Sequence, residues 1–183
     1  MALPLSDRDR TLRHTRSISI EVFRRQDGNW EIDASLQDVK THDVLAPNGV
    51  HVAGRPIHRM TVRLVMDGDF NILAAGAVSD RVPYPGSCES AADVYDLLTG
   101  LNVFRQFRRG LAERTGGIKG CTHLNELAAI LPTAIIQGMA EESFNFQTAD
   151  VRPFPIDQCH SLRADGDVVK TYFPKWHVAS SVK

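Results

Sequence analysis

Residues 16–39, RSISIEVFRRQDGNWEIDASLQDV, decide the fold that this sequence predicts. Apolar side chains occupy every second position on both sides of the Asp27-Gly28 pair, a dipeptide that favours a tight turn between strands. They are Ile18, Ile20 and Val22 before the turn, and Trp30, Ile32, Ala34 and Leu36 after it. A period of two turns one face of each strand toward a core. The stretch therefore predicts a β-hairpin.

A second hairpin is predicted further along the chain. Residues 57–66 alternate in the same way, residues 67–69 (Asp-Gly-Asp) favour a turn, and residues 70–79 form the returning strand. Residues 40–56 between the two hairpins have no long periodic run, and we expect a loop there. A loop of this length in a compact domain is often functional.

The second half of the chain has helical periodicity. Helices are predicted over residues 88–98, 102–114 and 122–142. We expect Asn102 and Thr122 to cap the second and third helices, because their short polar side chains can accept from free backbone N–H groups. Pro132 lies inside the third helix and is expected to kink it.

The order of these elements predicts an α+β fold, with an antiparallel sheet of two hairpins packed by about three helices. After a loop over residues 143–157, a short strand pair is expected around Asp165-Gly166. We expect a single domain over residues 1–183, with a core at about 14–142 and a C-terminal tail at 143–183.

Composition excludes several classes of protein. The 183 residues are 43% hydrophobic and 23% charged, with a formal net charge of −1, so we expect neither nucleic-acid nor membrane binding. No stretch approaches the roughly 18 apolar residues of a spanning helix, and the N-terminus lacks the apolar segment of a signal peptide, which predicts a cytoplasmic location. The three cysteines are an odd number and far apart, which does not suggest a disulfide framework.

The sharpest local pattern is Gly120-Cys121-Thr122-His123, where a thiol and an imidazole stand at the start of a predicted helix. A helix N-terminus stabilises a thiolate, so Cys121 could be a nucleophile with His123 as its base. A buried cysteine beside a histidine satisfied by a local backbone bond is the simpler explanation of the pattern. Both interpretations stay open.

A metal site could be assembled from distant segments. Cys88 also precedes a predicted helix, His58 begins the third strand, and Cys159 precedes His160 near the C-terminus. Together with Cys121 these side chains form a soft donor set that suits zinc or iron. Each could equally be a buried or capping residue without a function.

Several charged residues are candidates for acid–base chemistry or substrate binding. Asp38 and Lys40 lie at the end of the second strand, and Glu126 is one turn into the long helix. Lys40, Arg55 or Arg59 could hold a carboxylate or phenolate of a substrate, while His123 or Glu126 moves protons. The sequence lacks nucleotide-binding, zincin, hydrolase-elbow and C-x-x-C motifs.

Many short motifs, in order along nearly the whole chain, resemble an uncharacterised bacterial family catalogued as a domain of unknown function, number twenty-eight eighty-nine. The motifs are Arg24-Arg25-x-Asp27-Gly28-x-Trp30-x-Ile32, Leu36-x-Asp38-x-Lys40, Pro56-Ile57-His58-x-Met60, Gly120-Cys121-Thr122-His123-Leu124-x-Glu126-Leu127, Cys159-His160-x-Leu162 and Tyr172-x-Pro174-x-Trp176. This resemblance loosely implies the catabolism of aromatic compounds.

A weaker resemblance covers about residues 56–140. Two strands joined by an Asp-Gly turn, a loop cysteine and a cysteine that opens a long helix are similar to the iron–sulfur scaffold fold of the NifU N-terminal and SufU type. In that comparison Cys88 and Cys121 match two of the three scaffold cysteines, and His58 lies near the position of the first. The remaining thiol is missing unless Cys159 replaces it. The resemblance implies a metal site at this corner of the fold.

Three functional hypotheses follow. The first is a small enzyme, a metal-dependent or Cys/His-based lyase or hydrolase, acting on a small organic substrate. The alternative is a zinc or iron–sulfur scaffold without catalytic activity, and the third is an interaction module with buried cysteines. The exposed hairpins would also permit a homodimer.

Overall fold

The computed structural model describes residues 9–143 and 151–179. The chain divides into two compact units, Met1–Gly138 and Met139–Lys183. This division lies close to the boundary expected between a core and a C-terminal tail. Among the described residues, no helix is long and apolar enough to cross a membrane.

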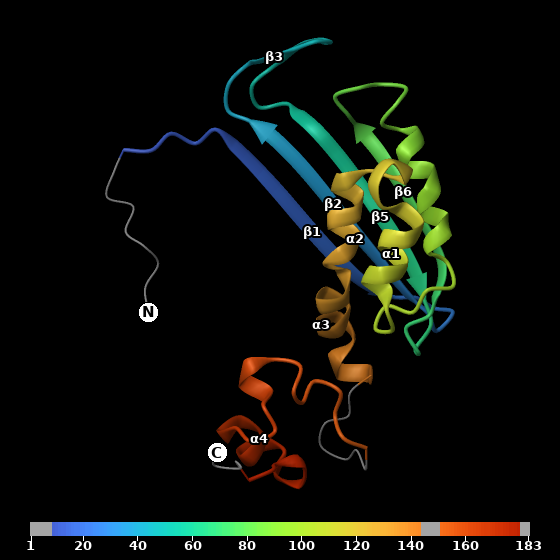
Figure 1. The fold of residues 1–183 in the computed structure, drawn as a ribbon, viewed down its shortest axis with the longest axis vertical. Helices are drawn as coiled ribbons and strands as arrows, with labels where there is room; N and C mark the ends of the chain where they lie inside the picture. Colours follow the sequence, from blue (N-terminus) through green and yellow to red (C-terminus); the bar gives the residue numbers. More distant parts are fainter. Residues whose placement is uncertain (1–8, 144–150, 180–183) are drawn as a thin grey trace. The chain divides into compact units, whose positions relative to one another are not determined.

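A four-stranded antiparallel sheet forms the framework of the first unit (Figure 1). Its spatial order is β1-β2-β5-β6, and its strands are β1 (His14–Arg24), β2 (Trp30–Lys40), β5 (Pro56–Met66) and β6 (Ile72–Arg81). Both predicted hairpins are therefore confirmed, with β2 and β5 as the central strands. The α+β class is also confirmed.

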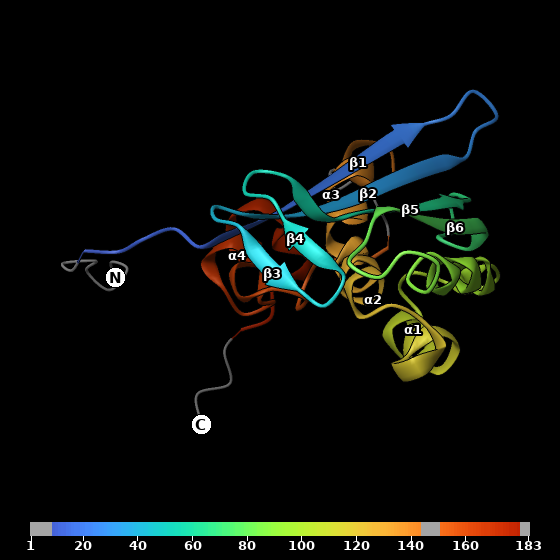
Figure 2. The ribbon, with the colours of Figure 1, turned by 90° about the horizontal axis from the view of Figure 1, so that it is seen from above.

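One face of the sheet carries the core. On β2 and β5 the buried side chains alternate with partly exposed ones, and the register pairs Ala34 with Val62 and Leu36 with Met60. A 3-10 helix η1 (Ser90–Leu98) and helices α1 (Phe107–Thr115) and α2 (Thr122–Ala129) cover this face (Figures 1 and 2). Burying one large apolar side chain contributes about 1.5–3 kcal/mol relative to leaving it exposed. The opposite face of the sheet has more exposed and more polar residues.

The predicted loop over residues 40–56 contains a small hairpin of its own. Strands β3 (Val44–Ala46) and β4 (Gly49–His51) pair with each other and project beyond the end of the main sheet (Figure 2). Gly49 has a φ of 121° in the turn, a conformation open to glycine and strained for other residues. Strands of three residues are too short to show a period of two, which explains why the sequence did not predict them.

Two of the predicted helices differ from expectation. Residues 90–98 form a 3-10 helix, and the second helix starts at Phe107 rather than at residue 102. The side chain of Asn102 is not the helix cap: its Oδ1 accepts from the N–H of Phe104 in a local turn, its Nδ2 donates to the carbonyl oxygen of Asp69 and to Oδ1 of Asn71, and the capping position belongs to Gln106. Asn102 therefore ties the chain to the turn before β6, and the helix begins one turn later.

The long helix expected over residues 122–142 is two helices, α2 and α3 (Leu131–Ser143), separated at Ile130. Pro132 is the second residue of α3, a position where its missing N–H costs nothing. The expected kink is thus a complete break. Thr122 is the first residue of α2, and Cys121 takes the capping position predicted for Thr122.

The second unit has a small core of its own. Ile156, Ala164 and Val169 are buried together, with Leu162, Phe173 and Trp176 packed around them. The prediction of a strand pair around Asp165-Gly166 was wrong, because Gly166 precedes the short helix α4 (Asp167–Tyr172) instead of forming a hairpin turn. Within the loop predicted over 143–157, residues 144–150 lie outside the described part of the chain.

Candidate functional site

A polar row continues the apolar core at one end of the sheet. The register places Arg16 of β1 opposite Asp38 of β2, and Asp38 opposite His58 of β5. These positions have the same parity as the core residues Leu36 and Met60, so their side chains leave the sheet on the helix-covered face. The sheet thus brings three functional groups from three strands into one row.

The carboxylate of Asp38 is the centre of this arrangement. Its side chain is only 5% exposed. Arg16 grips both oxygens, with Nε 2.8 Å from Oδ1 and Nη2 2.8 Å from Oδ2. His14 Nε2 lies 3.0 Å from Oδ1, and His58 Nδ1 lies 2.9 Å from Oδ2. Each oxygen therefore has two polar partners, as many as a carboxylate oxygen readily accepts.

These contacts set the charges of the groups. Burial acts to raise the pKa of Asp38, but the hydrogen bonds and charge of Arg16, with the hydrogen bonds of His58 and His14, outweigh it and hold this pKa well below its ordinary value. Burial and the neighbouring His123 lower the pKa of His58, against the opposing effect of Asp38. Asp38 is therefore ionised at neutral pH, while His58 is held as a neutral imidazole.

Helix α2 adds further groups above the row. The ring of His123 lies against the ring of His58, with 4.0 Å between centroids. Nε2 of His123 is 3.9 Å from Oδ2 of Asp38, and its Nδ1 is 3.7 Å from Sγ of Cys121. One turn later Glu126, whose side chain is 60% exposed, accepts from Nη1 of Arg16 at 2.9 Å. We call Asp38, His58 and His123 the Asp38 cluster.

A buried hydrogen-bond network fixes the first turn of α2. The hydroxyl of Tyr95 lies 3.0 Å from the carbonyl oxygen of Cys121 and 2.8 Å from Oδ1 of Asn125. Oγ1 of Thr115 donates to the same Oδ1, and Asn125 donates in turn to the carbonyl oxygen of Thr115. The network joins η1, α1 and α2. Because His123 lies between Cys121 and Asn125, the network also holds His123 over the sheet.

Gly120 is required by the same packing. A Cβ added there would lie 2.6 Å from the carbonyl oxygen of Thr115 and 3.3 Å from the hydroxyl of Tyr95. We expect Gly120→Ala to lower the free energy of unfolding by about 1–3 kcal/mol, because backbone has to move to admit the methyl group. Chemical denaturation measures this loss. Gly68→Ala is the matched control, since nothing lies within 4 Å of the added carbon there; equal losses in the two variants would contradict the account.

The residues proposed from the sequence fall into two groups. Five of them come together at the end of the sheet: Asp38, His58, Cys121, His123 and Glu126. Within the part of the chain that the structure describes, the cluster of potential metal ligands is Asp38, His58 and His123, and it includes no cysteine.

The remaining candidates lie outside this cluster. Cys88 is half-buried in the segment after β6, and Cys159 is exposed and belongs to the second unit. Lys40 pairs with His14 in the sheet register. Arg55 lines a separate cavity at the start of β5. Cys88 and Cys121 were both chosen because each precedes a predicted helix, but only Cys121 lies beside the Asp38 cluster.

Sequence reasoning missed His14 and Arg16. The signal that could have found them is the alternation already used for the core. Extending the face of Ile18 and Ile20 backward by two and four positions reaches Arg16 and His14. The same extension along β2 and β5 reaches Asp38 and His58, so the whole row follows from strand parity once the strands pair.

Comparison with protein families now places the chain. A family described as Protein of unknown function (DUF2889) matches residues 14–137, more than half of the chain. The chain belongs to this family. The DUF2889 match begins at His14 and contains every member of the Asp38 cluster together with Arg16, Cys121 and Glu126. It also ends within one residue of the division between the two units.

Further comparisons added no named relative. No significant match was found among curated proteins or among solved structures. The resemblance to the NifU and SufU scaffold fold therefore has no support from them and stays a prediction. The family resemblance drawn from the sequence motifs is confirmed for DUF2889 over residues 14–137, while the motifs at residues 159–162 and 172–176 lie outside the match.

Proposed function

We propose that this DUF2889 protein is a small metal-dependent enzyme, a hydrolase or a lyase, and that the Asp38 cluster holds its zinc or iron ion. The observation that carries the proposal is that one ligand atom each from Asp38, His58 and His123 lies within 4.8 Å of the others. Two imidazoles and one carboxylate are a donor set of catalytic zinc and non-haem iron sites. Three protein ligands leave a coordination position for water or a substrate oxygen.

The surroundings of the cluster support this role. A histidine must be neutral to bind a metal, and burial lowers the pKa of His58 in that direction. Arg16 and His14 hold the carboxylate of Asp38 in one orientation, as outer partners of metal ligands commonly do. Glu126 is exposed and close to Arg16, so it is the residue we assign to proton transfer with a small organic substrate.

A second candidate mechanism uses the same site without a metal. Its support is that Arg16, His14 and His58 already occupy both oxygens of Asp38, while Sγ of Cys121 lies 3.7 Å from Nδ1 of His123. In this mechanism Cys121 is the nucleophile and His123 its base, with Asp38 orienting the imidazole from the other side. The scaffold hypothesis has less support, because the cluster contains no thiol.

Elemental analysis of the purified protein tests the proposal. Protein prepared without chelator is expected to contain about one zinc or iron per chain, to lose it on dialysis against a strong chelator, and to regain it when the metal is returned. Protein that neither retains nor takes up either metal would contradict the metal-dependent mechanism. If metal-free protein is active and alkylation of Cys121 abolishes that activity, the thiol mechanism is favoured.

A further inference from the structure

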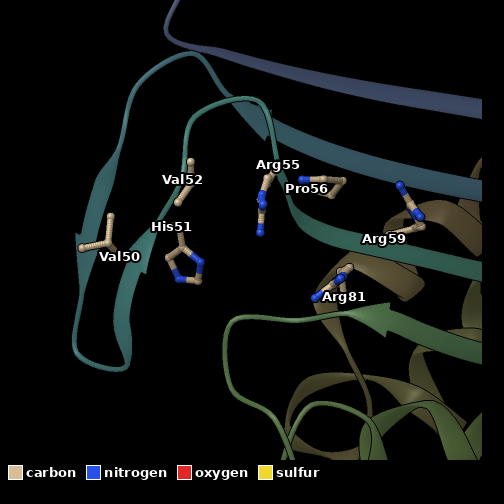
Figure 3. Close-up of a pocket in the computed structure, with 7 residues that line it drawn as sticks. All are labelled: Val50, His51, Val52, Arg55, Pro56, Arg59 and Arg81. Atoms are coloured by element: carbon tan, nitrogen blue, oxygen red, sulfur yellow. The ribbon is translucent and has the colours of Figure 1, made fainter.

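A second cluster of functional groups lies outside the Asp38 cluster, in a cavity of about 370 Å³ at the same end of the sheet. Its walls are β4 with the segment after it, the start of β5 and the end of β6 (Figure 3). Arg59 follows His58 directly in β5, and successive side chains of a strand point to opposite faces. The cavity is thus a separate site on the other side of β5.

Three arginines line this cavity: Arg55, Arg59 and Arg81. Within residues 9–143 and 151–179, none of them forms an ion pair, and Arg59 donates only to the neutral Gln37, at 3.3 Å. Other arginines of this unit do have carboxylate partners. They include Arg16 with Asp38, Arg25 with Asp27, Arg63 with Asp33 and Arg109 with Glu113.

The sheet brings two of these charges together. Arg59 and Arg81 are directly opposite in the register of β5 and β6, and like charges in that arrangement destabilise a sheet. A register shift beside this pair leaves Asp80 as an extra residue on β6, and bulges of this kind redirect side chains. Asp80 lines a neighbouring hollow together with Arg59, but in the described structure it forms no ion pair with either arginine.

The frame of the cavity is held without a ligand. At its base the N–H of Gly54 donates to the carbonyl oxygen of Lys40 at 2.9 Å, and the N–H of Ala53 donates to Asp43 at 2.8 Å. At the far end Asn48 donates to the carbonyl oxygen of Pro83, just beyond β6. Figure 3 shows Arg55 and His51 projecting toward the loop that follows β6, with Arg81 at the end of β6 beside the same space, whereas the head of Arg59 is directed toward β2, where its Nε donates to Gln37.

We infer that this cavity is a binding site for a small organic dianion, a molecule with a phosphoryl or paired carboxylate head. Guanidinium groups match such oxyanions in both charge and geometry. Val50, Val52 and Pro56 add apolar wall, which favours a ligand with a small hydrophobic body over a free inorganic ion. The site needs no metal and is independent of the Asp38 cluster.

Calorimetric titration of the chelator-treated 183-residue protein tests this inference. Phenyl phosphate and phthalate are the probes, and inorganic phosphate and phenol separate the contribution of charge from that of the apolar body. We expect at least one organic dianion to bind, more tightly than inorganic phosphate, and phenol not to bind. Preference between the two probes assigns the head as phosphoryl or dicarboxylate. Failure of both dianions to bind would overturn the inference.

Variants locate the site. Arg55→Gln and Arg81→Gln are each expected to weaken binding roughly 10- to 100-fold. Arg63→Gln is the matched control, because Arg63 also lies on β5 but is paired with Asp33 and does not line the cavity. This variant should bind the dianion with the affinity of the wild type. Equal affinity in all three variants would overturn the inference. As a folding check, ligand-free Arg81→Gln should melt no lower than the wild type, since it removes the opposed charges. Chelation excludes the metal, so a negative result leaves the proposal for the Asp38 cluster standing.

Discussion

Asp38→Asn is expected to lower the free energy of unfolding by about 3 kcal/mol. The substitution removes the charge that Arg16, His14 and His58 all face in a buried position. Breaking a buried ion pair typically costs 3–5 kcal/mol, and we expect the lower end because the side chain of Arg16 is 32% exposed and can regain water. Chemical denaturation at neutral pH measures the difference.

Asp33→Asn is a matched control for this variant. Asp33 is also on β2 and also pairs with an arginine of a neighbouring strand, Arg63, but on the opposite face, where the side chain of Arg63 is 57% exposed. An exposed pair of this kind contributes up to about 1 kcal/mol. If the two variants lose the same free energy of unfolding, the buried contacts of Asp38 stabilise the fold no more than an exposed ion pair does.

The stabilisation that Asp38 contributes should depend on pH in a defined direction. Because the folded protein lowers the pKa of Asp38, the stabilisation is complete above the ordinary aspartate pKa of about 3.9. It is lost as the pH falls below that value. The difference between wild type and Asp38→Asn should therefore narrow as the pH falls below about 4.

Removing either histidine of the Asp38 cluster is expected to have the largest effect on metal binding. His58→Ala and His123→Ala each delete one of three proposed ligands, so we expect the affinity for zinc to fall by about 100-fold or more, beyond the 10- to 100-fold typical of outer partners. His14→Ala, which removes an outer partner of Asp38, should fall within that smaller range. Competition against a chromogenic chelator measures all three.

Cys88→Ala separates this account from the ligand set expected from the sequence. Cys88 lies outside the Asp38 cluster, so its replacement should leave zinc affinity unchanged. If Cys88→Ala loses zinc and His58→Ala retains it, the cysteines and not the Asp38 cluster are the metal ligands. Far-ultraviolet circular dichroism of each variant distinguishes a lost ligand from a lost fold.

The main sheet could be predicted because all four strands are long and alternate in sequence, although only the central strands β2 and β5 are half-buried and Ile18 of β1 is exposed. Strands of ten or eleven residues with one face on the core show a period of two over many positions, and Asp-Gly turns mark both hairpins. The β3–β4 hairpin and the break at Ile130 depend on local geometry instead. A proline at the second position of a helix has the same neighbours in sequence as a proline that kinks one, and only packing decides between them.

The site was predictable in part. Asp38, His58, His123 and Glu126 were each candidates, but helix starts drew attention to Cys88 and Cys121 as metal ligands. Strand register groups Arg16, Asp38 and His58, and register depends on which strands pair, an arrangement that a single sequence does not specify. The cavity arginines come together for the same reason, since Arg59 and Arg81 are 22 positions apart and meet only across β5 and β6.

X-ray absorption at the metal edge of the purified protein tests the central claim most directly. Coordination by the Asp38 cluster predicts a first shell of nitrogen and oxygen only, at about 2.0–2.2 Å for zinc, with the outer-shell scattering of two imidazoles. A sulfur shell near 2.3 Å would place the metal on cysteines. That result, or a protein that binds no metal, would contradict the account.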